Sequence, residues 1–124
     1  MKLDHDCVRH LLLAIEENVP AGSRISIGLL QGDYPLPDVL YAAEKLHEAG
    51  YITVSYLCGE TSPQSMLIES LTWKGHEFLD NIRDGKIWAT TKETVSKFSS
   101  TSLSILSNVA GQILSAAIKA QIGL

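Results

Sequence analysis

The segment that most constrains the fold is Leu71-Thr72-Trp73-Lys74-Gly75-His76-Glu77-Phe78-Leu79-Asp80. Thr72 is a residue type that favours the N-cap position of a helix. Phe78, Leu79 and Ile82 follow it at helical spacing, and the residues before it have the composition of a β-strand. The segment therefore predicts a β-hairpin whose second strand leads directly into a capped helix. Its threonine, tryptophan and phenylalanine are expected to have structural roles in the fold.

The hairpin itself is predicted from two apolar runs. Residues 51–57 are rich in β-branched and aromatic side chains, and residues 66–71 form the returning strand. Gly59, Ser62 and Pro63 between these runs are turn-forming residues. We therefore expect two strands joined by a loop of about eight residues.

Two helices are predicted before the hairpin. The first spans about residues 4–17, with Asp4 as its N-cap and Pro20 beyond its end. The second spans about residues 37–49, with Gly50 in the position that follows a helix C-terminus. The apolar stripe of the first helix consists of Val8, Leu11, Leu12 and Ile15.

The segment between these helices completes the predicted fold. Residues 24–29 carry β-branched Ile25 and Ile27 on one face and predict a short strand, whereas residues 31–36 have a loop composition. The predicted order is helix, short strand, helix, β-hairpin, helix. This is the order of a winged helix whose usual second helix is shortened or replaced by a loop. The predicted fold class is therefore α+β with a winged-helix-like core.

More helix is predicted beyond the hairpin than one winged helix needs. Residues 72–83 form one predicted helix, and Asp84-Gly85 marks a break or a new cap. Trp88, Thr91, Val95 and Phe98 then follow at helical steps of three, four and three residues. A heptad-like repeat of apolar residues follows, and we take it as the candidate oligomer seam. It consists of Leu103, Leu106, Ala110, Ile113 and Ala117. We therefore divide the chain into a winged-helix-like domain, residues 1–84, and a helical extension for assembly or docking, residues 85–124.

Composition limits the class of protein. A chain of 124 residues with 45% hydrophobic and 19% charged side chains can bury one core and is too short for two independent domains. The two cysteines, Cys7 and Cys58, do not make a disulfide framework, and no positively charged region of the kind found in export signals precedes an apolar run at the N-terminus. These features predict a cytoplasmic protein.

Two patterns carry a resemblance to a known family. The chain begins with Met1-Lys2-Leu3-Asp4-His5-Asp6-Cys7-Val8-Arg9-His10-Leu11-Leu12-Leu13-Ala14-Ile15-Glu16-Glu17, and residues 71–84 read Leu-Thr-x-x-Gly-His-Glu-Phe-Leu-Asp-x-Ile-Arg-Asp, with Trp88 after them. These patterns resemble a family of short, uncharacterised phage and bacterial proteins that is classed as a domain of unknown function. The resemblance implies a prophage or mobile-element origin and a winged-helix-like core. It brings no established activity and no catalytic residues.

The sequence shows no residue set that predicts catalysis or metal binding. Cys7 and His10 have helical spacing, but no second ligand pair accompanies them, and His5 does not share a helix face with Cys7. His76 and Glu77 are adjacent on a predicted helix and so point in different directions. A Gly-rich phosphate loop and a nucleophile elbow are also missing from the sequence. We therefore expect a non-enzymatic protein without cofactor, metal or small-molecule substrate.

The charge distribution bears on the DNA binding that a winged helix suggests. Residues 1–72 carry four basic and ten acidic side chains, whereas residues 73–124 carry six basic and four acidic ones. The helix before the hairpin, which usually enters the major groove, has three carboxylates and one lysine, and the wing loop, residues 57–65, has Glu60 and no lysine or arginine. This surface should repel duplex DNA. The candidate nucleic-acid contacts are Lys86, Lys92 and Lys97, although a solvated helix face would also explain these lysines.

Two other surfaces are candidates for contacts. Tyr41, Lys45 and Glu48 share an outward face of the second predicted helix and form a candidate partner surface. The tail, residues 99–124, is apolar and has one charge, Lys119, but its serine, asparagine and glutamine side chains would be costly in hydrocarbon. We therefore expect the tail to self-associate or dock rather than enter a membrane.

Two functions follow from these observations. The first is a phage- or prophage-derived, winged-helix-like regulatory module that forms a homo-oligomer through its C-terminal helices and binds DNA or a protein. The second is a protein-interaction factor that engages a host component through its acidic helix or wing and does not bind nucleic acid.

Overall fold

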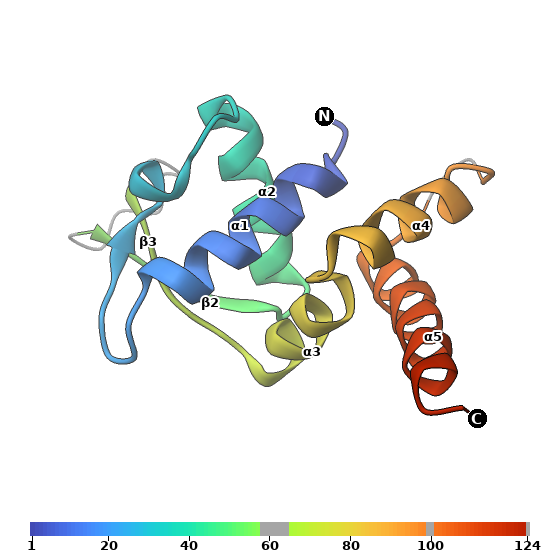
Figure 1. Cartoon of the computed structure of the whole chain (residues 1–124). Coiled ribbons are helices and arrows are strands. Elements are labelled where there is room, and N and C mark those ends of the chain that lie inside the picture. Colours follow the sequence, from blue (N-terminus) through green and yellow to red (C-terminus); the bar gives the residue numbers. More distant parts are fainter. Residues whose placement is uncertain (58–64, 99–100, 124) are drawn as a thin grey trace. The chain divides into compact units, whose positions relative to one another are not determined.

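The computed structural model describes residues 1–57, 65–98 and 101–123 of the chain (Figure 1). The chain forms two compact units, Met1–Glu77 and Phe78–Leu124. The boundary between them falls within helix α3 (Trp73–Ile82). The predicted extension, residues 85–124, therefore lies entirely within the second unit, and the first unit contains the predicted hairpin.

The first unit has the winged-helix-like order of elements that the sequence predicts. Its elements before α3 are α1 (His5–Asn18), β1 (Ile25–Ser26), the short 3-10 helix η1 (Ile27–Leu30), α2 (Leu36–Glu48), β2 (Ile52–Tyr56) and β3 (Met66–Leu71). Together with the second unit, the described residues form five α-helices and one three-stranded antiparallel sheet. The predicted α+β fold class is therefore confirmed.

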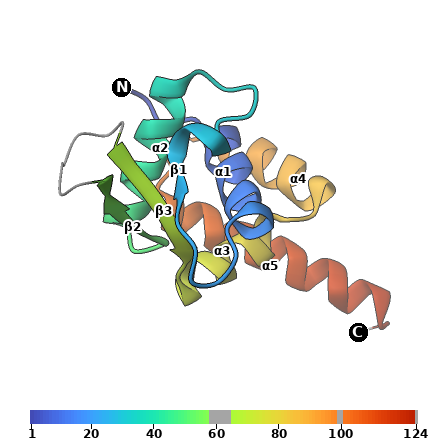
Figure 2. The ribbon, with the colours of Figure 1, turned by 90° about the vertical axis from the view of Figure 1, so that its left-hand side faces the viewer.

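The sheet joins the hairpin to the short first strand (Figure 2). Its strand order is β1-β3-β2, and both pairings are antiparallel, with Ile25 opposite Ile68. The pairing of β2 with β3 shifts register between Thr53 and Val54, as at a β-bulge. The loop predicted between β2 and β3 lies outside the described residues, except at Leu57 and Ser65.

The core of the first unit lies where the sheet meets α1 and α2. Helix α1 packs on α2 and on β3, and α2 packs on β2. The large side chains that these elements bury completely or almost completely are Leu11, Leu12, Ile15, Leu46, Ile52, Met66 and Ile68. Each such side chain contributes about 1.5–3 kcal/mol to the stability of the fold on burial. The predicted apolar stripe of α1 forms one side of this core.

The local signals at the helix ends act as predicted. The Asp4 carboxylate accepts hydrogen bonds from the backbone N–H groups of Asp6 (2.9 Å) and Cys7 (3.3 Å) at the start of α1. Gly50 follows α2 with a φ of 84°, and the N–H groups of Gly50 and Tyr51 donate to carbonyls of the last turn. Glycine is favoured there because residues with a side chain rarely adopt that backbone conformation.

The strand predicted over residues 24–29 is the main error in this unit. Only Ile25 and Ser26 pair with β3, and Ile27–Leu30 forms η1 instead. Ile27 and Leu30 are buried while the residues between them are exposed. Because this burial repeats every three residues rather than every two, the segment suits a 3-10 turn better than a strand.

Several hydrogen bonds meet at the root of the hairpin in the first unit. Thr72 donates its backbone N–H to the carbonyl of Tyr51 (3.0 Å) and its hydroxyl to the carbonyl of Gly50 (2.6 Å). The same hydroxyl accepts the backbone N–H of Gly75 (3.1 Å), which is the predicted N-cap bond of α3. Thr72 therefore ties the end of α2, the start of β2 and the start of α3 together.

Gly75 completes this arrangement by its lack of a side chain. A Cβ atom at this position would collide with the backbone carbonyl oxygen of Tyr51. Lys74 contributes a further tie, because its ammonium donates to the carbonyl of Ala49 (3.0 Å) and lies 4.6 Å from the centroid of the Tyr51 ring. We call Thr72, Gly75, Gly50 and Tyr51 the hairpin-root contact.

The second unit contains the end of α3, α4 (Gly85–Val95) and α5 (Leu103–Gln121). Asp84 caps α4 as predicted, because its carboxylate accepts the N–H groups of Lys86 (2.8 Å) and Ile87 (3.0 Å). Helices α4 and α5 pack on each other, and Trp88 and Thr91 are buried. The side-chain amide of Asn81 donates to the carbonyl of Ser107 (3.1 Å), which fixes one side of α5 beside the end of α3.

Two aromatic side chains lie elsewhere than the sequence predicts. Phe98 is 71% exposed, because α4 ends at Val95 and the helical spacing from Trp88 stops there. Trp73 is 79% exposed and does not serve the core. The buried side of α3 consists of Gly75, Phe78, Leu79 and Ile82. Position 73 lies about 200° around the helix from position 75, so Trp73 points away from that side.

We predict that Gly75→Ala destabilises the protein by about 2 kcal/mol, although alanine is the better helix former, because the new methyl group would force the backbone apart. Gly85→Ala is the matched control, since nothing lies within 4 Å of a Cβ at that helical position. Gly85→Ala should leave the stability unchanged or raise it by up to about 1 kcal/mol. Urea unfolding followed by circular dichroism measures both changes. Equal effects of the two substitutions would contradict the close approach at Gly75.

Candidate functional site

The predicted partner surface on α2 forms one connected group. The Lys45 ammonium lies 2.9 Å from a carboxylate oxygen of Glu48 and 5.3 Å from the centroid of the Tyr41 ring. The hydrogen bond with Glu48 and the charge of that carboxylate raise the pKa of Lys45. Tyr41, Lys45 and Glu48 thus lie together on the surface, and the lysine charge is already paired with a carboxylate.

This pairing leaves the outer side of α2 acidic. Lys45 is the only lysine or arginine in the helix, which also carries Asp38, Glu44 and Glu48. His47 is turned to the sheet, where its Nδ1 lies 3.3 Å from the carbonyl oxygen of Ile52. A helix with this balance offers no unpaired lysine or arginine side chain to DNA phosphates, which are most strongly bound by such groups.

Trp73 adds an exposed aromatic ring at the end of this helix. The first turn of α3 is held at the C-terminal end of α2 by the Lys74 ammonium, which donates to Ala49. Trp73 belongs to that turn and exposes 79% of its surface. The spacing of the buried α3 positions, 75, 78, 79 and 82, is the sequence signal that would have placed Trp73 outside the core.

The three lysines that were candidates for nucleic-acid contacts do not form one basic stripe. Lys86 is exposed in the first turn of α4, whereas Lys97 lies beyond the end of that helix. Lys92 lies over the ring of Trp88, with its ammonium 5.7 Å from the ring centroid. Six helical residues separate Lys86 from Lys92, which places them about 120° apart around the helix axis. The exposed Glu93 lies next to Lys92.

The predicted oligomer seam divides into a buried and an accessible part. Leu103, Leu106 and Ala110 are buried within the chain itself, in the part of α5 where it packs with α4. Ile113 is half-buried and Ala117 is exposed. The first three residues are therefore occupied inside one molecule, whereas Ile113 and Ala117 are left at least partly accessible for contact with another.

The residues near Cys7 form a structural cluster. Cys7 is fully buried, and this burial, with the nearby charges of Asp4 and Asp38, raises the pKa of its thiol to about 11. The Nε2 atom of His10 lies 3.1 Å from the carbonyl oxygen of Leu30. Within the described part of the chain, no group of three or more His, Cys, Asp or Glu side chains could hold a metal ion.

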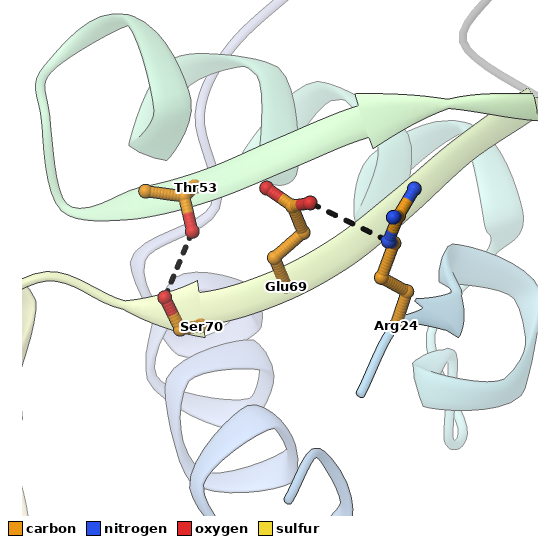
Figure 3. A network of polar contacts seen from close by, with 4 residues as sticks. All are labelled: Arg24, Thr53, Glu69 and Ser70. Atoms are coloured by element: carbon orange, nitrogen blue, oxygen red, sulfur yellow. Dashed lines mark hydrogen bonds and ion pairs between the residues drawn. The ribbon is translucent and has the colours of Figure 1, made fainter. Parts of the chain in front are cut away.

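His76 lies beside a small groove of the first unit. The groove has a volume of about 170 Å³, and its other polar residues are Glu16, Glu69 and Ser70. Glu69 forms an ion pair with Arg24 at 3.7 Å, and the Ser70 hydroxyl lies 2.8 Å from that of Thr53 (Figure 3). These contacts link the strands across the sheet surface. His76 and Glu77 are both exposed.

Comparisons with known proteins place the chain in a family. The family model described as "Hypothetical protein (DUF2513)" matches residues 2–102. A protein of Haemophilus influenzae (strain ATCC 51907 / DSM 11121 / KW20 / Rd), named "Uncharacterized protein", is 35% identical over 118 residues, which cover 93% of this chain and 97% of that protein. No solved structure matches the chain. The chain therefore belongs to the DUF2513 family of hypothetical proteins.

Proposed function

We propose that the chain is a non-enzymatic, phage- or prophage-derived regulatory module that acts in the cytoplasm by binding another protein. The contact would be made by Tyr41, Lys45 and Glu48 of α2 together with Trp73, which we call the partner surface. The single observation that carries this proposal is the 79% exposure of Trp73 beside the end of α2. The phage origin rests on the sequence resemblance alone.

An exposed tryptophan favours a protein contact on energetic grounds. The indole is a large apolar group, and leaving it in water forfeits about 1.5–3 kcal/mol that burial would contribute. Tryptophan is also enriched among the residues that dominate protein–protein binding. Trp73 is held in place because the next residue, Lys74, is anchored to Ala49 and lies over the Tyr51 ring. A ring on such a fixed helix turn loses little conformational freedom when a partner covers it.

The charge of α2 selects the kind of partner. Asp38, Glu44 and Glu48 give its outer side a negative potential, and the Lys45 ammonium is engaged by Glu48. Opposite charges across an interface speed association and reject partners of the wrong sign. The partner would therefore present basic side chains and an apolar recess for the Trp73 ring.

The other function that a winged-helix-like core suggests is DNA binding, and this function can be tested directly. We expect no binding to a labelled random-sequence DNA duplex at about 50 mM salt, because α2 is acidic and Lys92 lies about 120° around α4 from Lys86. Fluorescence anisotropy measures the binding. Saturable binding at about 50 mM salt that weakens steeply by about 200 mM would show phosphate contacts and would replace our proposal with a DNA-binding function.

A second test uses the partner surface directly. The immobilised protein is incubated with a nuclease-treated lysate of a bacterium that carries the gene, beside the variants Trp73→Ser, Glu48→Lys and Glu93→Lys. Because truncating a dominant interface residue costs about 2 kcal/mol or more, Trp73→Ser should reduce the retained partner at least about tenfold. Glu48→Lys should also reduce it, by reversing a charge of the partner surface.

Glu93→Lys is the matched control in that experiment. It makes the same charge reversal at an exposed position of α4, which belongs to the second unit and is not part of the partner surface. It should retain the partner as the unchanged protein does. Mass spectrometry quantifies the retained proteins. If no protein is retained, or if all four samples retain the same proteins in the same amounts, the proposed surface is wrong.

A further inference from the structure

Helix α5 carries an apolar stripe that the core of its own unit does not use. The stripe, which we call the outer stripe, consists of Ile105, Val109, Ile113, Ala116 and Ala120. Ile105 is 55% exposed, Val109 and Ile113 are half-buried, and both alanines are exposed. The spacing of four, four, three and four residues keeps these positions on one side of the helix through four turns.

The other sides of α5 are used only in part within the second unit, and Ile118 remains 53% exposed. Leu103, Leu106 and Ala110 are buried, and Ser107 receives the hydrogen bond of Asn81. A polar stripe precedes the outer stripe by one residue at each step and consists of Ser104, Asn108, Gln112, Ser115 and Lys119. The polar stripe suits water, whereas the outer stripe has neither a charged nor a hydrogen-bonding side chain.

The helix that packs on α5 is too short to cover it. Helix α4 has 11 residues and α5 has 19, so their lengths are about 16 Å and about 28 Å. From Ser115 onwards every described residue of α5 is exposed. The apolar surface that begins in the buried part of α5 therefore continues beyond it without a covering element in this unit.

We propose that the outer stripe is covered by the same stripe of a second copy of this chain, with the two α5 helices antiparallel. Side-chain size along the stripe favours this pair, because the side chains are large at its start and small at its end. In an antiparallel pair centred on residues 112 and 113, Ile105 lies opposite Ala120 of the partner subunit. Val109 then lies opposite the partner's Ala116.

This size order distinguishes the antiparallel pair from a parallel one. Each large side chain meets a small one in the antiparallel pair, so the helix axes can keep one separation along the contact. A parallel pair would place Ile105 against its own copy and Ala120 against its own copy. The isoleucines would then hold the alanine ends apart and leave a gap.

A membrane is the other apolar environment that α5 could enter by its length and composition. The helix has 19 residues and is apolar enough for its length to cross a membrane. Its polar stripe, however, would place two amides and the Lys119 ammonium in hydrocarbon, where such groups are costly. Helices that lie on membrane surfaces are rich in lysine and arginine, and α5 has only Lys119. A pair in water covers the outer stripe and leaves the polar stripe hydrated.

The test compares two adjacent substitutions that introduce the same charge. Gel filtration with light scattering should give the mass of two chains for the unchanged protein at high concentration. Ala116→Glu, on the outer stripe, should reduce this to the mass of one chain, whereas Ser115→Glu, on the polar stripe, should leave the dimer intact. Circular dichroism checks that both variants keep their helix content. A monomeric parent protein, or an equal effect of both substitutions, would overturn the proposal.

Two further arms test the orientation and the membrane alternative. Ile105→Glu alone should give monomers, and the double variant Ile105→Glu/Ala120→Lys should dimerise again, because the new charges oppose each other only in the antiparallel pair. Failure of the double variant to dimerise would overturn the antiparallel arrangement. Flotation of the parent protein with phosphatidylcholine vesicles would contradict the proposal that a second copy covers the outer stripe. This proposal does not depend on the partner surface, so either can fail without the other.

Discussion

The hairpin-root contact is the interaction on which the first unit depends. Thr72 makes three hydrogen bonds there: its N–H donates to the carbonyl of Tyr51, and its hydroxyl donates to the carbonyl of Gly50 and accepts from the N–H of Gly75. One residue thus joins the end of α2, the start of β2 and the first turn of α3. The contact requires glycine at position 75, because a side chain there would meet the backbone of Tyr51. Trp73 is exposed because this contact sets the phase of α3.

The sequence predicts the local features of this fold well, because each depends on a few neighbouring residues. Asp4 caps α1, Gly50 ends α2 and Thr72 caps α3, and each does so with the expected hydrogen bonds or backbone conformation. The strand at residues 24–29 was predicted from β-branched composition, which does not reveal that only two residues find a partner on β3. A structural role for Trp73 is predicted from residue type, but the ring is 79% exposed, as the helical phase of α3 indicates.

The candidate surfaces were less predictable, because they depend on which charges and apolar groups are already paired. The sequence places Tyr41, Lys45 and Glu48 on one helix face, but only the structure shows that Lys45 is engaged by Glu48 and stacked near Tyr41. The sequence also predicts one continuous seam on α5, whereas its first half is buried within the chain. The surface left for partners is therefore acidic and aromatic on the first unit, and apolar and uncharged on α5.

The most direct test of this account is the solvent exposure of Trp73 in solution, measured by acrylamide quenching of fluorescence. In a Trp88→Phe variant, Trp73 is the only tryptophan, and we expect its emission to be quenched almost as strongly as that of free tryptophan. In a Trp73→Phe variant, the buried Trp88 should be protected, since only 4% of its surface is exposed. Strong protection of Trp73 in the Trp88→Phe variant would contradict the partner surface, because the ring would already be covered within the chain.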